Sequence, residues 1–372
     1  MIVRFEDVIT RITGNVDRYN TDLEYYVGGD QYDSSSLTIE RRGDLKKDVD
    51  ILGFKFHFPF KSGDVLLMAR NPHLRKAGQV FFDGLCSDAS YILRTKDEKR
   101  LRQNYIPIIL QSNHFWDWFE SHKTGGITFL LNWGMLKGYE FDLPNSDVQD
   151  SIMEKVWAAY KLKQSYQKLI IATDEIVKSR FIEMFRENDY QIVPLGELCK
   201  KITDGSHNPP KGIDHSQYLM ISSQNIYSDA LDLSDVRYLT KEDFENEDKR
   251  TSVSEGDILL TIVGTIGRVY LVSGNEGNIT LQRSVAVLTP NDRITSRFLM
   301  CSFLYDDNFS KEGRGNAQKG VYLKQLSQYT LRLPSIDNQK AFEEIYKQAD
   351  KSKFELKQAI EKIDKVMRAL LQ

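Results

Sequence analysis

The chain has 372 residues, of which 41% are hydrophobic and 28% are charged, and its formal net charge is −3. This length and composition allow two ordinary domains with packed cores, and they exclude a disordered chain. The weakly acidic balance excludes a protein coated with positive charge, but it leaves room for local basic faces.

Cysteine use and hydropathy point to a reduced, cytoplasmic setting. The three cysteines, Cys86, Cys199 and Cys301, lie too far apart for a metal knuckle, and their odd number argues against a disulfide framework. The first residues do not resemble a signal peptide, and no apolar run approaches the ~18 residues that a membrane span requires. We therefore expect a cytoplasmic protein with no membrane partner.

The predicted elements form two copies of one pattern, a β-rich region followed by a long helix. The first copy comprises residues 1–145 and a helix over 146–187, and the second comprises residues 191–334 and a helix over 335–372. The expected fold class is therefore α+β, with two mixed α/β domains separated by two long helices.

Matching residues recur at an offset of 190 positions, which indicates an internal duplication. Residues 139–149 and 329–339 both contain a Tyr, a Leu-Pro pair and a Gln at equivalent places. With a small change in register, Ser-Gly-Asp-Val-Leu-Leu at 62–67 matches Glu-Gly-Asp-Ile-Leu-Leu at 255–260. A colinear series of matches at one offset is typical of a duplicated unit.

Short apolar runs broken by glycine predict β-strands within the β-rich regions. In the second copy, the run 257–263 is followed by Gly264-Thr-Ile-Gly267 and then by a second apolar run at 268–272. Two such runs on either side of a glycine-containing turn predict adjacent strands.

Each predicted helix carries one apolar stripe with steps of three and four residues, so the stripe lies on one face. Neither helix is interrupted by glycine or proline, and each should be about 55–60 Å long. A helix of this length with a narrow stripe needs a partner, and the nearest candidate is its own copy. We expect an antiparallel coiled coil about a pseudo-twofold axis; the alternative is that each helix packs only on its own domain. The residues expected at the helix-pair interface are Ile152, Val156, Leu162, Tyr166, Leu169, Ile176, Phe342, Tyr346, Leu356, Ile360, Ile363 and Val366.

Several motifs suggest chemistry, but each lacks a necessary part. Asn208-Pro209-Pro210 resembles a motif of adenine methyltransferases, yet Lys211 follows where an aromatic ring would stack on the flipped base. Gly264-Thr-Ile-Gly267 is not a dinucleotide fingerprint, and no P-loop sequence is present. His207 and His215 share one loop and form only a weak metal signal. We therefore predict no catalytic residue, no metal and no cofactor in this chain.

Basic and amide side chains in turn-rich stretches are the candidates for contacts with nucleic acid. Glycine beside a cation, as in Gly313-Arg314-Gly315, lets the backbone approach a phosphate while the side chain reaches a groove. Taken singly, each cation is better explained as a solvated surface residue, but such cations, Arg283 among them, recur before the strand-to-helix junction of both copies. The predicted DNA-binding residues are Arg41, Arg70, Lys123, His207, Lys211, Arg268, Gln282, Arg314 and Lys319.

The order of these motifs resembles that of type I restriction–modification specificity subunits over essentially the whole chain. The Leu-Pro…Gln segments at 143–149 and 333–339, each before a long helix, resemble the spacers of this family. The first copy departs more, because Arg70-Asn-Pro-His73 stands where the second copy has its Gly-Thr-Ile-Gly turn. The segments that resemble a target-recognition domain are 195–198, 202–210, 256–259, 264–269 and Gln282.

The resemblance implies a non-catalytic adaptor. Two target-recognition domains would each bind half of a split double-stranded DNA site, and the paired helices would hold them apart and dock two methyltransferase subunits. In a larger complex, two ATP-driven restriction subunits would join. S-adenosylmethionine and ATP would then belong to these partners and not to this chain.

Two other classes of function remain open at this point. One is a standalone or partnered DNA methyltransferase or nuclease with built-in recognition domains, for which the chain has no unassigned stretch that could hold a catalytic module. The other is a coiled-coil scaffold unrelated to DNA, which predicts no DNA retention even when partners are present.

Overall fold

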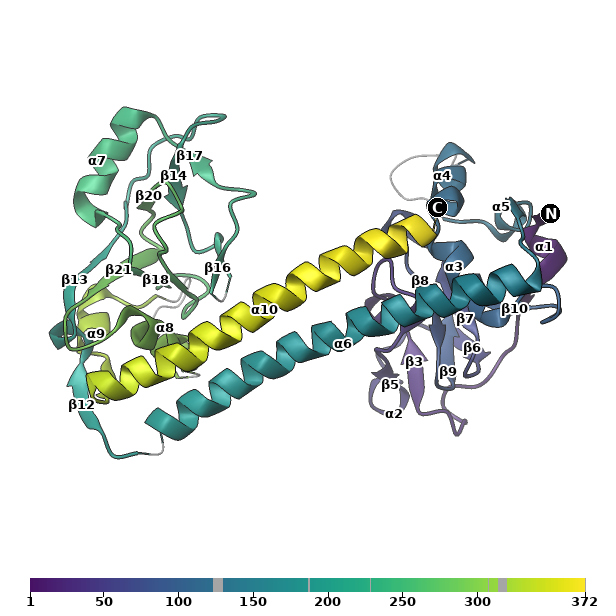
Figure 1. Ribbon diagram of the computed structural model, residues 1–372, viewed down its shortest axis with the longest axis horizontal. Coiled ribbons are helices and arrows are strands. Elements are labelled where there is room, and N and C mark those ends of the chain that lie inside the picture. Colours follow the sequence, from purple (N-terminus) through teal and green to yellow (C-terminus); the bar gives the residue numbers. More distant parts are fainter. Residues whose placement is uncertain (123–129, 187, 228, 307, 314–319, 372) are drawn as a thin grey trace. The chain divides into compact units, whose positions relative to one another are not determined.

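The computed structural model describes residues 1–122, 130–186, 188–227, 229–306, 308–313 and 320–371. The chain divides into two compact units, unit 1 with Met1–Lys168 and Leu356–Gln372, and unit 2 with Leu169–Glu355. Each unit contains a β-rich domain and parts of the two long helices, α6 (Ser146–Phe185) and α10 (Ile336–Leu370) (Figure 1).

The β-rich domain of unit 1 has sheets with the strand orders β2–β10–β7–β8–β4, β5–β3–β9–β6 and β1–β11. The strands are β1 (Ile2–Arg4), β2 (Ile9–Ile12), β3 (Tyr25–Val27), β4 (Thr38–Ile39), β5 (Gly43–Asp44), β6 (Phe56–Phe60), β7 (Val65–Met68), β8 (Ala77–Val80), β9 (Gly84–Ser87), β10 (Ser90–Thr95) and β11 (Glu140–Asp142). The short helices are α1 (Phe5–Val8), α2 (Leu45–Asp48), α3 (Ile106–Gln111), α4 (Asn113–His122) and α5 (Trp133–Leu136).

The β-rich domain of unit 2 has sheets with the strand orders β13–β21–β18–β19, β17–β14–β20, β15–β16 and β12–β22. The strands are β12 (Gln191–Pro194), β13 (Cys199–Asp204), β14 (Tyr218–Ile221), β15 (Ile226–Tyr227), β16 (Ala230–Leu231), β17 (Arg237–Tyr238), β18 (Ile258–Thr261), β19 (Val269–Leu271), β20 (Asn278–Leu281), β21 (Val285–Pro290) and β22 (Thr330–Leu333). The short helices are α7 (Lys241–Thr251), α8 (Ser296–Leu304) and α9 (Leu323–Gln328).

The central strand of each domain is buried on both faces, which explains its continuous apolar run. Side chains alternate between the faces of a strand. In β7, Val65 and Leu67 belong to one core cluster and Leu66 to another. In β18, Leu260 and Leu259 are divided in the same way. Each central sheet is therefore the middle layer of its domain, with a core on either side.

Strand pairings repeat between the two domains and confirm the predicted duplication. β1 pairs with β11 as β12 pairs with β22, with the same offset of 190 positions between partners. The parallel pair β3–β9 has its counterpart in β14–β20, and the antiparallel pair β3–β5 has its counterpart in β14–β17. The strands predicted to be adjacent, β18 and β19, pair with each other, and the pairing is antiparallel.

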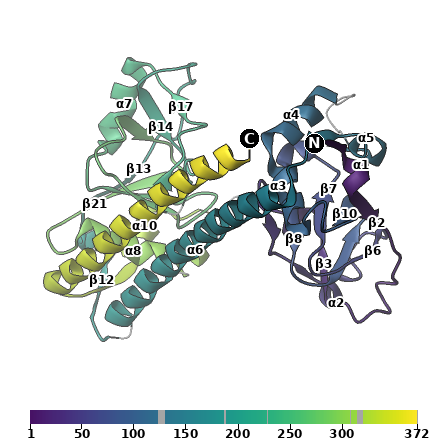
Figure 2. The ribbon, with the colours of Figure 1, turned by 45° about the vertical axis from the view of Figure 1, so that its right-hand side comes forward.

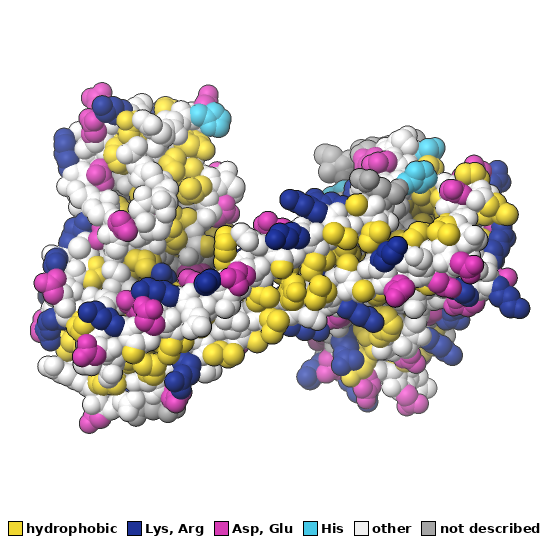
Figure 3. All heavy atoms as spheres, viewed as in Figure 1, with side chains coloured by type: hydrophobic (Ala, Val, Ile, Leu, Met, Phe, Trp, Pro, Cys, Tyr) yellow, Lys and Arg dark blue, Asp and Glu magenta, His cyan; other side chains and the backbone are white. Residues whose placement is uncertain are grey.

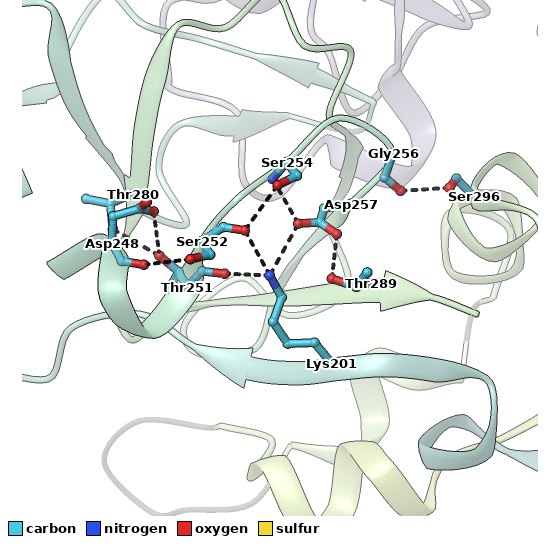
Figure 4. Close-up of polar contacts among 10 residues, drawn as sticks. All are labelled: Lys201, Asp248, Thr251, Ser252, Ser254, Gly256, Asp257, Thr280, Thr289 and Ser296. Atoms are coloured by element: carbon cyan, nitrogen blue, oxygen red, sulfur yellow. Dashed lines mark hydrogen bonds and ion pairs between the residues drawn. The ribbon is translucent and has the colours of Figure 1, made fainter. Parts of the chain in front are cut away.

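The repeated Gly-Asp motif forms a turn with a buried aspartate before each central strand. The glycine has a positive φ, +95° in unit 1 and +87° in unit 2, which glycine adopts without strain. Asp257 accepts a hydrogen bond from the backbone N–H of Ser254 at 3.0 Å and lies 3.6 Å from the Lys201 ammonium (Figure 4). Asp64 pairs with Arg94 at 2.7 Å in the same way. The motif is therefore a folding element in both domains.

The long helices α6 and α10 lie side by side in both ribbon views (Figures 1 and 2). Lys163 pairs with Asp364 at 2.6 Å in unit 1, and Lys353 pairs with Asp174 at 2.7 Å in unit 2. The two lysines are 190 positions apart, and so are the two aspartates, so the pairs are copies of each other. From Lys163 to Asp174 the residue numbers rise along α6, while those of their partners on α10 fall from Asp364 to Lys353. The two helices therefore run antiparallel.

The helices also contribute to the domain cores, so the alternative that each packs only on its own domain is too narrow. Val156 of α6 and Met367 of α10 belong to the core cluster of unit 1. Val177 of α6 and the aromatic side chains of Phe342 and Tyr346 of α10 belong to that of unit 2. Each helix is therefore anchored at both ends.

The residues predicted at the interface between the helices differ in how exposed they are. Predicted residues that are buried or half-buried are Ile152, Val156, Tyr166, Phe342, Tyr346, Leu356, Ile360 and Ile363. The other predicted residues have side chains that are 44–61% exposed, namely Leu162, Leu169, Ile176 and Val366 (apolar atoms exposed along the helices are visible in Figure 3). Each lies one position before a more buried residue, and those residues are Lys163, Ile170, Val177 and Met367. At 162–163, hydrophobicity selected the apolar Leu162, whereas the less exposed residue is Lys163, whose charge pairs with Asp364.

Candidate nucleic-acid interface

A polar cleft lies at one edge of the sheet β17–β14–β20 in unit 2. Since β14 and β20 are parallel, the segments that follow them, 222–225 and 282–284, leave the sheet at the same edge. Together with Arg237 of β17 and Val263 after β18, they line a cleft of about 540 Å³.

The cleft offers side chains that form paired, directional hydrogen bonds. Guanidinium and amide groups donate or accept two hydrogen bonds in one plane, which suits the base edges that the DNA major groove presents. The polar lining residues are Arg237, Arg283, Gln224, Gln282, Ser222, Ser223, Ser284, Asn225 and Asp235.

Backbone hydrogen bonds hold the segment 282–284 rigidly behind these side chains. The N–H of Gln282 donates to the carbonyl oxygen of Ile221 at 2.8 Å, and the N–H of Arg283 donates to that of Ser206 at 2.9 Å. The segment is thus tied to both of its neighbours, so its side chains project from a fixed backbone.

The opposite wall is fixed by a buried asparagine. Asn225 is 4% exposed, and its side-chain N–H donates to the carbonyl oxygens of Asp232 at 3.0 Å and Asp235 at 3.1 Å. Hydrogen bonds from Ser234 hold the pKa of the Asp232 carboxyl below its usual range. These contacts order the turn that carries Asp235 to the cleft.

Of the predicted DNA-binding residues, Gln282 lines this cleft, whereas Arg268 does not. The Arg268 guanidinium donates to the carbonyl oxygen of Ile226 at 3.1 Å and lies 4.6 Å from the ring centre of Tyr227. Arg268 is half-buried and ties β15 to the start of β19, so it has a structural role within its own domain.

His207 and Lys211 lie in the loop between β13 and β14. The Nε2 atom of His207 is 3.0 Å from a carboxylate oxygen of Asp204, which also pairs with Arg250. Lys211 is exposed, and no hydrogen bond or ion pair joins it to another described residue. Across the described ranges, no group of three His, Cys, Asp or Glu side chains could hold a metal ion.

In unit 1, Arg70 occupies a place comparable to the cleft wall of unit 2. It is exposed directly after β7 and forms an isolated antiparallel bridge with Leu130. An equivalent bridge joins the cleft residue Val263 to Gly320, and Leu130 and Gly320 are again 190 positions apart. The comparison supports Arg70 as a surface residue on the same side of its domain.

The guanidinium of Arg41 already forms hydrogen bonds within its own domain. Its guanidinium donates to the carbonyl oxygen of Tyr32 at 3.1 Å and to the Asp33 carboxylate at 2.7 Å. The remaining predicted DNA-binding residues lie outside the described residues; they are Lys123, Arg314 and Lys319.

Sequence reasoning missed Arg237 and Gln224, which line the cleft, and it considered Arg283 without selecting it. Arg237 and Gln224 reach the cleft only because β14 pairs with β17 on one side and with β20 on the other. No local motif marks these pairings. Arg283, by contrast, directly follows the selected Gln282, and that adjacency was a usable signal.

The thiols of Cys86, which is buried, and Cys199, which is half-buried, are poor nucleophiles. Burial raises the pKa of Cys86 to about 12 and that of Cys199 to about 12. Both therefore remain protonated near neutral pH, which is typical of structural cysteines. None of the described helices combines the length and the apolar character of a membrane span.

The fold is shared with solved proteins of type I restriction–modification systems. A chain from the study "Structural basis underlying complex assembly and conformational transition of the type I R-M system" aligns with a TM-score of 0.60 at 17% identity, covering 100% of this chain and 96% of that chain. The S subunit of the type I restriction–modification system from M. genitalium aligns with a TM-score of 0.56 at 12% identity, covering 100% of this chain and 94% of that one.

Sequence similarity identifies the family. Residues 187–365 match the family described as "Type I restriction modification DNA specificity domain". The type I restriction enzyme EcoBI specificity subunit from Escherichia coli is 25% identical over 228 residues, which cover 59% of this chain and 44% of that subunit. This chain thus spans less than half the length of that curated relative. Residues 187–365 therefore carry a DNA specificity domain of the type I restriction–modification family, and the whole chain shares the fold of solved proteins from these systems.

Proposed function

We propose that this chain reads a two-part double-stranded DNA site on behalf of a methyltransferase, with one half-site for each β-rich domain. The duplicated architecture carries the proposal, because equivalent strand pairings recur in both domains while the exposed residues at their edges differ. Two domains that share one fold but differ in their exposed side chains are suited to the recognition of two different half-sites. In this view the recognition domains comprise residues 1–145 and 191–334, and the spacers comprise 146–187 and 335–372.

The helix pair is the proposed spacer and the proposed platform for partner subunits. Ion pairs at equivalent positions, Lys163–Asp364 and Lys353–Asp174, support a fixed helix register, which a spacer requires. We expect two methyltransferase subunits and up to two restriction subunits to assemble on the chain. The complex would act on DNA in the cytoplasm.

The chain itself contributes recognition and no catalytic step. S-adenosylmethionine and ATP would be bound by the partner subunits. The DNA contacts that we propose comprise the residues selected from sequence, Arg41, Arg70, Lys123, His207, Lys211, Arg268, Gln282, Arg314 and Lys319, of which Gln282 has the best structural support because it lines the cleft.

The test is reconstitution with a methyltransferase subunit of a type I system. The complex is expected to methylate DNA within one two-part motif, while neither component alone transfers methyl groups. Methylation by the isolated chain would support the enzymatic alternative, and a complex that retains no DNA would support a scaffold unrelated to DNA. Either result would overturn the proposal.

A further inference from the structure

We propose that the cleft of unit 2 reads a G·C base pair, with Arg283 binding the guanine and Asp235 the cytosine. The inference rests on the proposed function, because it names the bases that this cleft recognises. It assigns a role to two residues that the sequence alone did not select.

Arg283 is the arginine of the cleft whose side-chain donors remain available. Its backbone N–H is fixed to Ser206 at 2.9 Å, but no hydrogen bond or ion pair engages its exposed guanidinium within the part of the chain that the structure describes. The second arginine, Arg237, already donates to the carbonyl oxygen of Pro210 at 3.1 Å. Arg283 therefore combines a fixed backbone with a free guanidinium, which favours specific over adaptable binding.

The chemistry of the lining favours a base edge over a phosphate. A guanidinium donates two hydrogen bonds to O6 and N7 of guanine, and a carboxylate accepts one from N4 of cytosine. Asp235 lies in the same cleft as Arg283 and would repel a phosphate placed there. Since O6, N7 and N4 of a G·C pair lie together in the major groove, the two side chains match one base pair.

Gln282, which directly precedes Arg283, offers further hydrogen-bond donors in the cleft. The Ser284 hydroxyl lies 3.4 Å from its Oε1 atom, and the amide N–H groups of Gln282 have no partner among the residues described. These donors are free for the adjacent base pair. The turn 282–284 thus presents two consecutive side chains that suit direct reading of base edges.

The experiment uses the full chain assembled with its methyltransferase subunit and a library of DNA duplexes randomised across the second half-site. Arg283→Ala should lower the preference for guanine at one position by about 5- to 150-fold and leave the first half-site unchanged. Arg283→Gln should replace that guanine preference with one for adenine, because glutamine binds N6 and N7 of adenine. Arg293→Ala is the matched control, since Arg293 is exposed in the same domain but pairs with Glu197 at 3.7 Å and does not line the cleft.

The possible outcomes separate this inference from the proposed function. If the wild-type complex shows no sequence preference, the proposed function itself fails. If the wild type reads a two-part motif and both Arg283 variants keep its guanine, the inference is wrong. Weaker methylation of all sequences without a change in preference would also overturn it, because that result marks a phosphate contact. The Arg283→Gln variant keeps the test decisive if the alanine variant does not assemble.

Discussion

Replacement of Gln339 by leucine should destabilise unit 2 strongly, although the change preserves side-chain volume. Gln339 is fully buried in the first turns of α10. Its Oε1 atom accepts from the N–H of Thr295 at 2.8 Å, and its amide donates to the carbonyl oxygens of Arg293 at 3.1 Å and Pro334 at 3.0 Å. Leucine would abolish all three hydrogen bonds and leave the half-buried N–H of Thr295 without this partner.

The expected magnitude follows from these contacts. Each lost hydrogen bond costs about 0.5–1.5 kcal/mol, so Gln339→Leu should reduce the free energy of unfolding by about 2–4 kcal/mol. For a unit of this size, that loss lowers Tm by about 5–15 °C. Gln149 makes the equivalent contacts in unit 1, with Arg102 at 3.0 Å and with Arg100 and Pro144, so Gln149→Leu should act on unit 1 instead.

Calorimetry of the full chain, combined with hydrogen exchange to assign each transition to a unit, measures the effect. Gln348→Leu is the control, because Gln348 lies exposed on the same helix. The reasoning would be refuted if Gln339→Leu unfolded within about 2 °C of the control, since less than 1 kcal/mol would then be lost.

Two further predictions concern acid stability and the spacer. Partial burial raises the pKa of Glu276, but hydrogen bonds from Ser273 and Tyr270 outweigh it and lower the pKa from 4.5 to about 2. The contribution of Glu276 to stability is therefore complete above about pH 4.5 and is lost as the pH falls towards 2. The Tm difference between wild type and Glu276→Gln should shrink over this pH range. A constant Tm difference would contradict the assignment. Deletion of 165–171 together with 355–361 removes one heptad from each helix, keeps both interhelical ion pairs and shortens each helix by about 10 Å. The assembled methyltransferase should then recognise the same two half-sites but prefer a gap between them that is shorter by about three base pairs, at ~3.4 Å per pair. An active complex with an unchanged gap would show that the helices do not set the distance between the half-sites.

The features that sequence predicted are those encoded by local periodicity or by repetition. The duplication, the two long helices and the adjacent strands β18 and β19 each leave a regular pattern of apolar residues and glycines. The helix seam was predicted less well, because Lys163 lies on it and its paired charge is invisible to a hydrophobic pattern.

The cleft was largely unpredictable, because it depends on contacts between distant segments. Its walls meet only where β14 and β20 pair in parallel, and these strands are separated in sequence by five strands, β15 to β19, and helix α7. Arg268 shows that a local motif does not reveal the contacts of its side chain. A glycine-flanked arginine suggested a DNA contact, yet Tyr227 and Ile226 occupy its guanidinium.

The most direct test of modular, two-part recognition is a domain exchange in the assembled complex. Residues 191–334 would be replaced by the second recognition domain of another family member, and the methylated motif would be determined by sequencing modified DNA. The account predicts that one half-site changes to that of the donor while the other half-site is unchanged. A motif that changes in both halves, or in neither, would contradict it.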